Sequence, residues 1–436
     1  MRLDNVVALA LAASLTALAG ERAGNEDRRQ EDRALAQLGL VDPALVVTWN
    51  RTVNEIAFAE DQFFTFKGIR AHAMMHIAIH DALNAVVPFY RQFAYQGRDA
   101  SADPIAAAAQ AAHDVVLSQY PGEQARLDTE LANWLSQIPS EPRKARGITL
   151  GRRSAAAILA MRTGDGWDFQ GTYTFSPEIG AYQTTPPFNG FVFQPGFRFA
   201  RPFGLLAPSQ FRPGPPPPLG SIEYAAAYNE VKDYGRADSA FRTADQTLYA
   251  IWWMEFAEGS VNRLARELAT QRKTHLWQGA RMFALLNMSF FDGYVADWDS
   301  KFEHNHWRPY TAIRQAALDG NPATDADPIW EPLRITPPHP EYVSAHSTAC
   351  GASFEVLQRT LGDVAFTMGT TTAPPGMPTR SFNSFNAAAA ECADSRVRLG
   401  WHFRYATNAG LVLGRAVATW LVDHHLEFAP GSSGGR

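Results

Sequence analysis

The stretch WQGARMFALLNMSFFDGYVA at residues 277–296 carries apolar side chains three and four positions apart, which is the spacing of an α-helix with a buried face. The same spacing recurs through most of the chain in segments rich in Ala, Leu, Arg and Glu, which favour helix. Alternation with a period of two, the mark of a half-buried strand, is rare. We therefore predict an all-α fold, with helices over residues 68–87, 104–119, 141–163, 222–234, 243–271, 277–296, 345–361, 384–398 and 403–426.

One long interruption separates these helices, at residues 164–221. It contains Gly164, Gly166 and the proline-rich run at 213–218, all of which break helices. Its many aromatic residues are unsuited to a solvated linker. We therefore expect a long aromatic- and proline-rich loop that packs over the helical body.

The composition limits the class of protein. With 436 residues, 46% of them hydrophobic, the chain is long enough to bury a large core. Its formal net charge of -5 leaves no basic excess with which to bind nucleic acid. Nearly all the positive charge is arginine, because the sequence contains only five lysines, one of which is Lys301.

The N-terminus has the pattern of an export signal. Arg2 precedes an apolar stretch that ends in small residues before Gly20, as in signal peptides. The organisation that we predict is a signal peptide at 1–19, a mobile segment at 20–45, a single helical catalytic domain at 46–428 with the motif-bearing half at 236–428, and a flexible tail at 429–436. We expect a periplasmic or secreted protein without stable membrane insertion after removal of the signal.

The only two cysteines are Cys350 and Cys392. In an oxidising compartment they can form a disulfide. Both fall in predicted helices, however, where buried free thiols are common, and the sequence gives no distance between them. Two free thiols are therefore the favoured interpretation.

The first of three polar motifs is KFEHNHWRP at residues 301–309. Lys301 would lie at the end of one helix, and Pro309 suits the first turn of the next. Arg308 then stands beside a helix N-terminus, where backbone N–H groups favour an anion.

The other two motifs follow in the last hundred residues or so. In PPHPEYVSAH, a rigid proline-rich approach delivers Ser344 and His346 to the start of a helix. In SRVRLGWH, Arg396 precedes a turn at Gly400, and His402 stands at the opening of the last helix. Three cations, a hydroxyl group, helix N-termini and two histidines form a set suited to a compact tetrahedral oxyanion. One histidine can attack or coordinate its central atom while the other transfers a proton.

The motifs resemble the superfamily that joins vanadium-dependent haloperoxidases to type 2 phosphatidic acid phosphatases and bacterial class A acid phosphatases. Its shared pattern is Lys-x6-Arg-Pro, then Pro-Ser-Gly-His, then Ser-Arg-x5-His. The further likeness of PPHPEY and of HFRY at 402–405 is to the soluble haloperoxidases, and segments between residues 201 and 247 resemble the bacterial branch. The resemblance covers roughly residues 45–427 and implies the large helical-bundle haloperoxidase-like fold with a vanadate cofactor.

The resemblance also implies roles for individual residues. His402 would bind vanadium through its ring, and His346 would be the acid–base group for hydrogen peroxide, which Lys301 polarises. The oxygens of vanadate would be held by Lys301, Arg308, Ser344, Ala345 and Arg396. Halide would then be oxidised and would halogenate a small organic acceptor.

Two positions depart from the family pattern. Ala345 replaces a glycine; its N–H can still donate, but its Cβ takes up room beside the oxyanion. Ala406 stands where both branches commonly carry an aspartate, which in the phosphatases orients the nucleophilic histidine. This loss weakens the phosphatase interpretation more than the haloperoxidase one. A low-activity or inactive site is the minor alternative, unless a backbone carbonyl or another carboxylate orients the histidine.

The halide preference depends on His339, seven residues before His346. The resembling chloroperoxidases carry an aromatic residue here and the bromoperoxidases a histidine, so bromide or iodide is favoured, with Trp298 as the other wall of the pocket. The alternative for His339 is an ordinary surface-loop histidine.

We therefore interpret the chain as a vanadate-dependent haloperoxidase. A secreted acid phosphatase using the same site, with a histidine nucleophile, and an inactive oxyanion-binding protein are the alternatives. A homo-oligomer is compatible with the sequence. His72, His76 and His80 fall four residues apart on one helix, but their apolar surroundings favour a buried helix face over a metal site.

Overall fold

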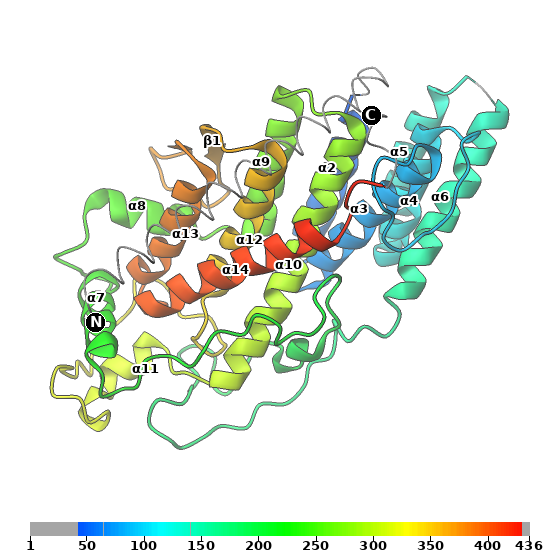
Figure 1. Cartoon of the computed structure of the whole chain (residues 1–436). Coiled ribbons are helices and arrows are strands. Elements are labelled where there is room, and N and C mark those ends of the chain that lie inside the picture. Colours follow the sequence, from blue (N-terminus) through cyan, green and yellow to red (C-terminus); the bar gives the residue numbers. More distant parts are fainter. Residues whose placement is uncertain (1–41, 64, 140, 430–436) are drawn as a thin grey trace, which may run out of the picture.

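Helix α10 (Leu276–His304) runs through the centre of the molecule, and nearly all of its side chains up to Lys301 are buried. A helix that is apolar on all sides needs neighbours on all sides. It packs against α3 (Lys67–Val86), α12 (Ala345–Leu361) and α14 (Arg404–His424), and Figure 1 shows α14 crossing it. The helix continues well past residue 296, where the predicted segment ends, and its last turn carries Lys301.

The computed structural model describes residues 42–63, 65–139 and 141–429. The predicted signal peptide, most of the predicted segment at 20–45 and nearly all of the predicted tail lie outside these residues. The remaining helices are α2 (Ala44–Asp61), α4 (Pro104–Gln119), α5 (Gln124–Ser136), α6 (Glu141–Met161), α7 (Ile222–Tyr234), α8 (Ala244–Trp252), α9 (Ala257–Gln271), α11 (Pro309–Arg314) and α13 (Phe385–Arg398), with short 3-10 turns at Pro121–Glu123, Pro195–Phe199 and Ala316–Leu318. Strands β1 (Phe366–Gly369) and β2 (Thr379–Phe382) pair antiparallel, with Phe366 opposite Phe382.

The predicted all-α class is confirmed, and most of the predicted helices are present within a few residues of their predicted ends. Figure 1 shows α3 to α6 at one end of the molecule and α7, α8, α11 and α13 at the other. The prediction missed α2, α5 and the small hairpin. Helix α2 begins at Ala44 and buries Leu45, so the helical body starts before the predicted boundary at residue 46.

The predicted single helix at 243–271 is wrong, because the chain forms two helices there. Helix α8 begins at a capping box between Thr243 and Gln246 and ends at Trp252, and α9 starts at Ala257. The break leaves backbone carbonyls without helical partners. The carbonyl of Trp253 accepts a hydrogen bond from Arg396 of α13, so the break serves the polar centre described below.

Close backbone approaches position the third motif. A Cβ atom on Gly410 of α14 would lie 2.6 Å from the carbonyl oxygen of Ser344, so only glycine lets the two helices cross at this distance. Gly400 has φ +80, and a Cβ there would lie 2.6 Å from the carbonyl oxygen of Gly235. This left-handed residue makes the turn between α13 and α14, as predicted.

The long loop at residues 164–221 packs on the helical body in part. Phe197 and Phe203 are buried and contact the ring of Phe291 on α10, as expected. Phe169 and Phe199 remain more than half exposed, which the prediction of a packed loop does not account for.

The expectation of two free thiols is wrong: Cys350 of α12 and Cys392 of α13 form a disulfide, with their Cα atoms 6.7 Å apart. The two helices pack side by side, which the sequence could not indicate.

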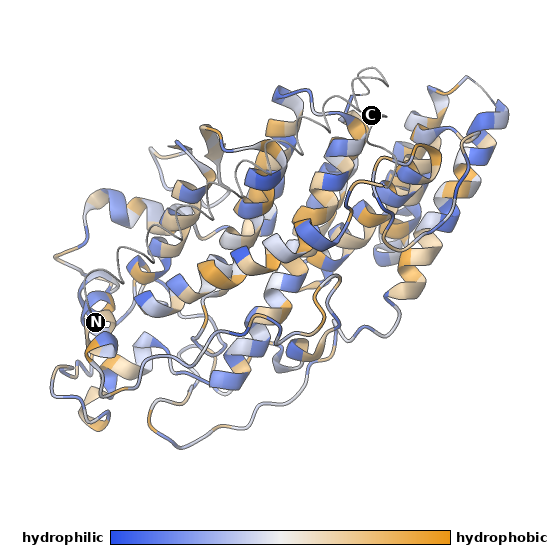
Figure 2. Ribbon diagram, in the orientation of Figure 1, coloured by the Kyte–Doolittle hydropathy of each residue, from blue (hydrophilic) through white to orange (hydrophobic). Residues whose placement is uncertain are grey.

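Figure 2 shows that α6 is mostly hydrophilic in its first half and mostly hydrophobic toward its end. Its buried residues recur three and four positions apart and so form one face, namely Gly147, Leu150, Gly151, Ser154, Ala155 and Ile158. Among the described residues, none of the helices combines the length and the apolar character that a membrane span requires.

Candidate functional site

His402 lies in the turn before α14, where two buried groups fix its ring. Its Nδ1 lies 2.9 Å from Oε1 of Glu341, and its Nε2 lies 3.0 Å from Nη1 of Arg308. A guanidinium group only donates hydrogen bonds, so Nε2 is the acceptor and Nδ1 carries the proton donated to Glu341. The third motif thus presents a ring nitrogen lone pair beside the arginine of the first motif.

Arg308 connects all three motifs and is fully buried at the N-cap of α11. Its Nε donates 2.9 Å to the carbonyl oxygen of His339, and Nη1 donates 3.0 Å to that of Trp401. Its Nη2 lies 3.0 Å from Nδ1 of His339. The three motifs, which are far apart in the sequence, therefore meet at one guanidinium group.

The two predicted walls of the halide pocket contact each other. The ring centroids of Trp298 and His339 are 5.0 Å apart. His339 is buried, so the alternative of a surface-loop histidine is wrong. Further aromatic rings surround Trp298, namely those of Phe66, Phe193, Phe197 and Tyr294.

Lys301 is fully buried in the last turn of α10. Its Nζ lies 3.6 Å from Oδ2 of Asp297, one turn earlier. It also donates to carbonyl oxygens of the segment that leads into α12, namely those of Pro340, Glu341 and Val343. Lys301 is therefore placed beside the second motif, where it anchors the approach to α12.

Ser344 is the N-cap of α12, as predicted, yet its side chain makes no capping hydrogen bond. Its Oγ accepts a hydrogen bond of 3.0 Å from Oγ of Ser347. The first N–H groups of a helix have no intrahelical acceptor. The backbone N–H of buried Ala345 is therefore open to an anion, which the helix dipole favours.

His346 of α12 and Arg396 of α13 each carry one unsatisfied nitrogen atom. Nε2 of His346 and Nη1 of Arg396 are buried and have no hydrogen-bond partner among the described residues. The other terminal nitrogen of Arg396, Nη2, donates 2.7 Å to the carbonyl oxygen of Trp253. Burial lowers the pKa of His346 and of His402 well below the usual value. The charge of Arg396 lowers the pKa of His346 further, and the charges of Arg308, Lys301 and Arg396 lower that of His402.

The site concentrates positive charge in a buried place. Burial lowers the pKa of Lys301 to about 8, that of Arg308 to about 10 and that of Arg396 to about 9. It raises the pKa of Asp297 to about 6 and that of Glu341 to about 8. An anion bound among the three cations offsets the cost of burying them.

These groups fit a tetrahedral oxyanion. Nη1 of Arg396 and the uncapped N-terminus of α12 offer hydrogen-bond donors to its oxygens. The lone pair on Nε2 of His402 suits its central atom, and the unpaired Nε2 of His346 suits an exchanging proton. Lys301 and Arg308 join the three motifs through contacts that include backbone carbonyls, and the assignment of these residues to an oxyanion site stays a prediction.

Two acidic residues of the site, Glu341 and Asp297, have no role predicted from sequence. The missing carboxylate at Ala406 is the signal that points to a substitute such as Glu341. Asp297 precedes Lys301 by four residues, which is the spacing of a helical ion pair.

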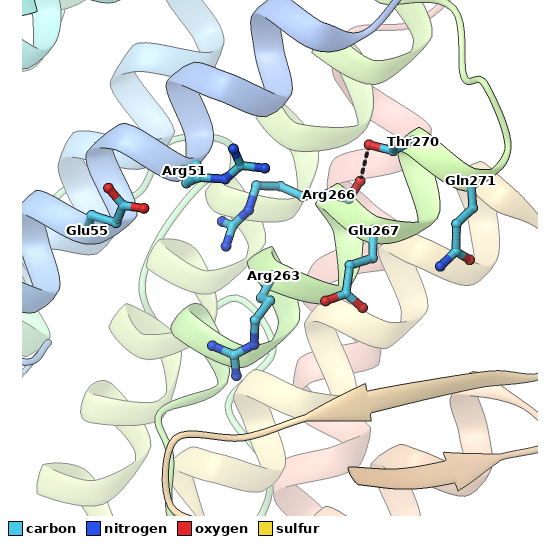
Figure 3. A pocket seen from close by; sticks show the side chains of 7 residues that line it. All are labelled: Arg51, Glu55, Arg263, Arg266, Glu267, Thr270 and Gln271. Carbon is cyan, nitrogen blue, oxygen red and sulfur yellow. Dashed lines mark hydrogen bonds between the residues drawn. The ribbon is translucent and has the colours of Figure 1, made fainter. Parts of the chain in front are cut away.

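Other polar clusters lie outside this site. Nε2 of His76, in the histidine stripe of α3, lies 2.9 Å from Nδ2 of Asn50 in a buried amide network. A pocket of about 490 Å³ between α2 and α9, shown in Figure 3, contains Arg266, whose Nη1 donates 2.6 Å to Oδ1 of Asn50. None of the oxyanion-site side chains is among its lining residues, which are Arg51, Glu55, Arg263, Arg266, Glu267, Thr270 and Gln271.

Comparison with known proteins gives consistent matches. Residues 281–431 match the family described as the VCPO second helical-bundle domain. A stretch of 90 residues is 33% identical to vanadium chloroperoxidase from Curvularia inaequalis and spans 18% of this chain but only 14% of that protein.

Solved structures extend the likeness to most of the chain. The structure of the first bacterial vanadium-dependent iodoperoxidase matches with a TM-score of 0.75 and 25% identity, over 89% of this chain and 98% of that one. A holo-type bacterial vanadium-dependent chloroperoxidase matches in fold, with a TM-score of 0.64 and 18% identity, over 81% of this chain and 90% of that one.

Proposed function

Because the chain belongs to the vanadium-dependent haloperoxidase family, we propose that it oxidises halide with hydrogen peroxide and thereby halogenates small organic acceptors. The observation that carries the proposal is the meeting of His346, Arg396, Arg308 and His402 in one buried site with oxyanion donors. Vanadate, held there, supplies the Lewis acidity that activates hydrogen peroxide toward halide.

The side chains of the site divide the remaining work. Nε2 of His402 is the nitrogen that faces the oxyanion position, because Nδ1 is committed to Glu341. Arg308, Arg396 and the N-terminus of α12 hold negative oxygens. Lys301 lies beside the same segment, and its ammonium group stabilises charge that develops on a reacting oxygen.

His346 is the group suited to proton transfer. Its Nε2 is buried and unpaired, and its pKa is lowered mainly by burial, so the ring is neutral at ordinary pH. A neutral imidazole accepts a proton from an incoming hydrogen peroxide and returns it to a departing oxygen.

Bromide or iodide is the proposed halide. His339 and Trp298 support this choice, since a histidine in contact with Arg308 replaces the aromatic residue that resembling chloroperoxidases carry. The buried aromatic rings beside Trp298 offer a polarisable surface to a large halide.

Export is the proposed location of the protein, in the periplasm or outside the cell. The apolar N-terminal stretch and the Cys350–Cys392 disulfide support it, because disulfides persist in oxidising compartments. Fractionation of cells that express the full chain tests this proposal, and recovery in the cytoplasmic fraction alone would contradict it.

The activity is tested with metal-free protein in the presence and absence of orthovanadate. We expect peroxide-dependent bromination of a phenolic dye and oxidation of iodide only after vanadate is added. The variant His402→Ala should show neither vanadate binding nor activity. Hydrolysis of an aryl phosphate that vanadate inhibits, without halide oxidation, would instead indicate a phosphatase.

A further inference from the structure

Helix α14 offers no carboxylate to His402. Ala406, four residues further on, is buried, and its carbonyl oxygen accepts a 3.2 Å hydrogen bond from the N–H of Ser344. A histidine that binds a metal usually donates its other ring N–H to a carboxylate, carbonyl or water, which fixes the tautomer and the ring orientation. Nδ1 of His402 therefore needs an acceptor from outside this helix.

Glu341 provides that acceptor from the segment before α12. Its Oε1 lies 2.9 Å from Nδ1 of His402 and accepts a second 2.9 Å hydrogen bond from the backbone N–H of Phe403. The side chain is fully buried, and Oε2 has no partner among the described residues. The hydrogen bonds of this carboxylate are thus directed to the turn that carries His402.

The backbone of Glu341 is held by the first motif. Its N–H donates 2.9 Å to the carbonyl oxygen of His306, and its carbonyl oxygen accepts 3.1 Å from Nζ of Lys301. The carboxylate is therefore aimed at His402 from a backbone that two contacts fix in place. This anchoring limits its freedom to turn away when the site binds an anion.

We propose that Glu341 is a positioning residue that keeps His402 in the Nδ1–H tautomer, with the Nε2 lone pair directed into the oxyanion site. Glu341 replaces the aspartate that is absent at Ala406, so the carboxylate comes from the segment before α12 and not from α14. The expected effect on vanadate binding rests on the proposed function. The tautomer of His402 can be measured without vanadate and does not depend on that function.

The first measurement is nitrogen NMR of the metal-free protein carrying labelled histidine, with the His402 signals assigned by comparison with His402→Ala. In the wild type we expect a protonated Nδ1 and an unprotonated Nε2. In Glu341→Ala only Arg308 still favours this tautomer, so the preference should weaken and the two nitrogen signals should move toward averaged values. A role confined to packing would not move them.

The second measurement is the dissociation constant for orthovanadate, from a calorimetric titration. We expect Glu341→Ala to weaken binding by roughly 10- to 100-fold, in the range seen for such supporting groups. Glu341→Gln keeps the shape and one acceptor oxygen, so its loss should be smaller. Glu341→Ala combined with Ala406→Asp should recover much of the affinity.

The control is Glu258→Gln, which changes a buried carboxylate that contacts Tyr294 and neither His402 nor Arg308. Its nitrogen signals and vanadate affinity should match the wild type. If Glu341→Ala fails to fold, Glu341→Gln replaces it in both measurements. Wild-type nitrogen signals together with wild-type vanadate affinity in the variant measured would overturn the proposal. A wild-type protein that binds no vanadate would count against the proposed function, while the NMR comparison would still decide the role of Glu341.

Discussion

Nη1 of Arg308 lies 3.0 Å from Nε2 of His402, although the two residues belong to motifs 94 positions apart. The same guanidinium group donates to the carbonyl oxygens of His339 and Trp401. Its fork geometry permits these directed contacts at once. The arrangement makes Arg308 the residue at which the site is assembled.

Arg308→Lys should weaken vanadate binding by roughly 10- to 100-fold, because an ammonium group cannot reproduce several directed hydrogen bonds to charged or buried partners. Calorimetric titration of the metal-free protein measures the effect. Arg314→Lys is the matched control on the same helix, since the hydrogen bonds of Arg314 go to the segment at 328–331 and its guanidinium group lies over the ring of Tyr310. Equal affinities in the two variants would contradict the assignment.

His346→Ala should separate binding from turnover. The variant keeps Arg308, Arg396 and His402, so we expect vanadate to bind within a few-fold of the wild-type affinity. Bromide oxidation at saturating peroxide should fall by roughly 10²- to 10⁴-fold, the usual contribution of a general acid–base group. A variant with undiminished kcat would show that His346 transfers no proton.

Glu258 should make the stability of the protein depend on pH. Burial raises its pKa from 4.5 to about 7, and the facing groups are Tyr294, Glu255 and Asp61. The folded state holds this proton more tightly than the unfolded chain. The contribution of protonated Glu258 to the free energy of unfolding is therefore fully present below pH 4.5 and is lost as the pH rises through 7. Its size is on the order of 3 kcal/mol.

Urea unfolding at pH 5 and pH 8 checks this effect. Between these pH values the free energy of unfolding should decrease less in Glu258→Gln than in the wild type, because a neutral amide does not titrate. An identical pH dependence in both proteins would show that the carboxyl group does not have a raised pKa.

The disulfide should stabilise the folded chain. Cys350 and Cys392 are separated by 42 positions, and closing a loop of that size lowers the entropy of the unfolded state by an amount worth about 4 kcal/mol. Reduction should lower the unfolding temperature of the wild type. The variant Cys350→Ala/Cys392→Ala should already unfold at this lower temperature, and added reductant should not change it further.

The sequence by itself determined the helical class and named the candidate residues of the oxyanion site. Helical periodicity follows from the local spacing of apolar residues, so α10, α12 and α14 were predictable, although α10 extends eight residues beyond the predicted end. The three motifs name Lys301, Arg308, Ser344, Arg396 and His402 without reference to distance.

Only the tertiary structure decided which groups meet across the chain. The contact of Glu341 with His402 and the disulfide between Cys350 and Cys392 join residues 61 and 42 positions apart. The break between α8 and α9 is another such case, because the carbonyl oxygen of Trp253 accepts a hydrogen bond from Arg396, 143 residues later. Local propensity carries no information about such pairs, since their distance is set by how the helices cross.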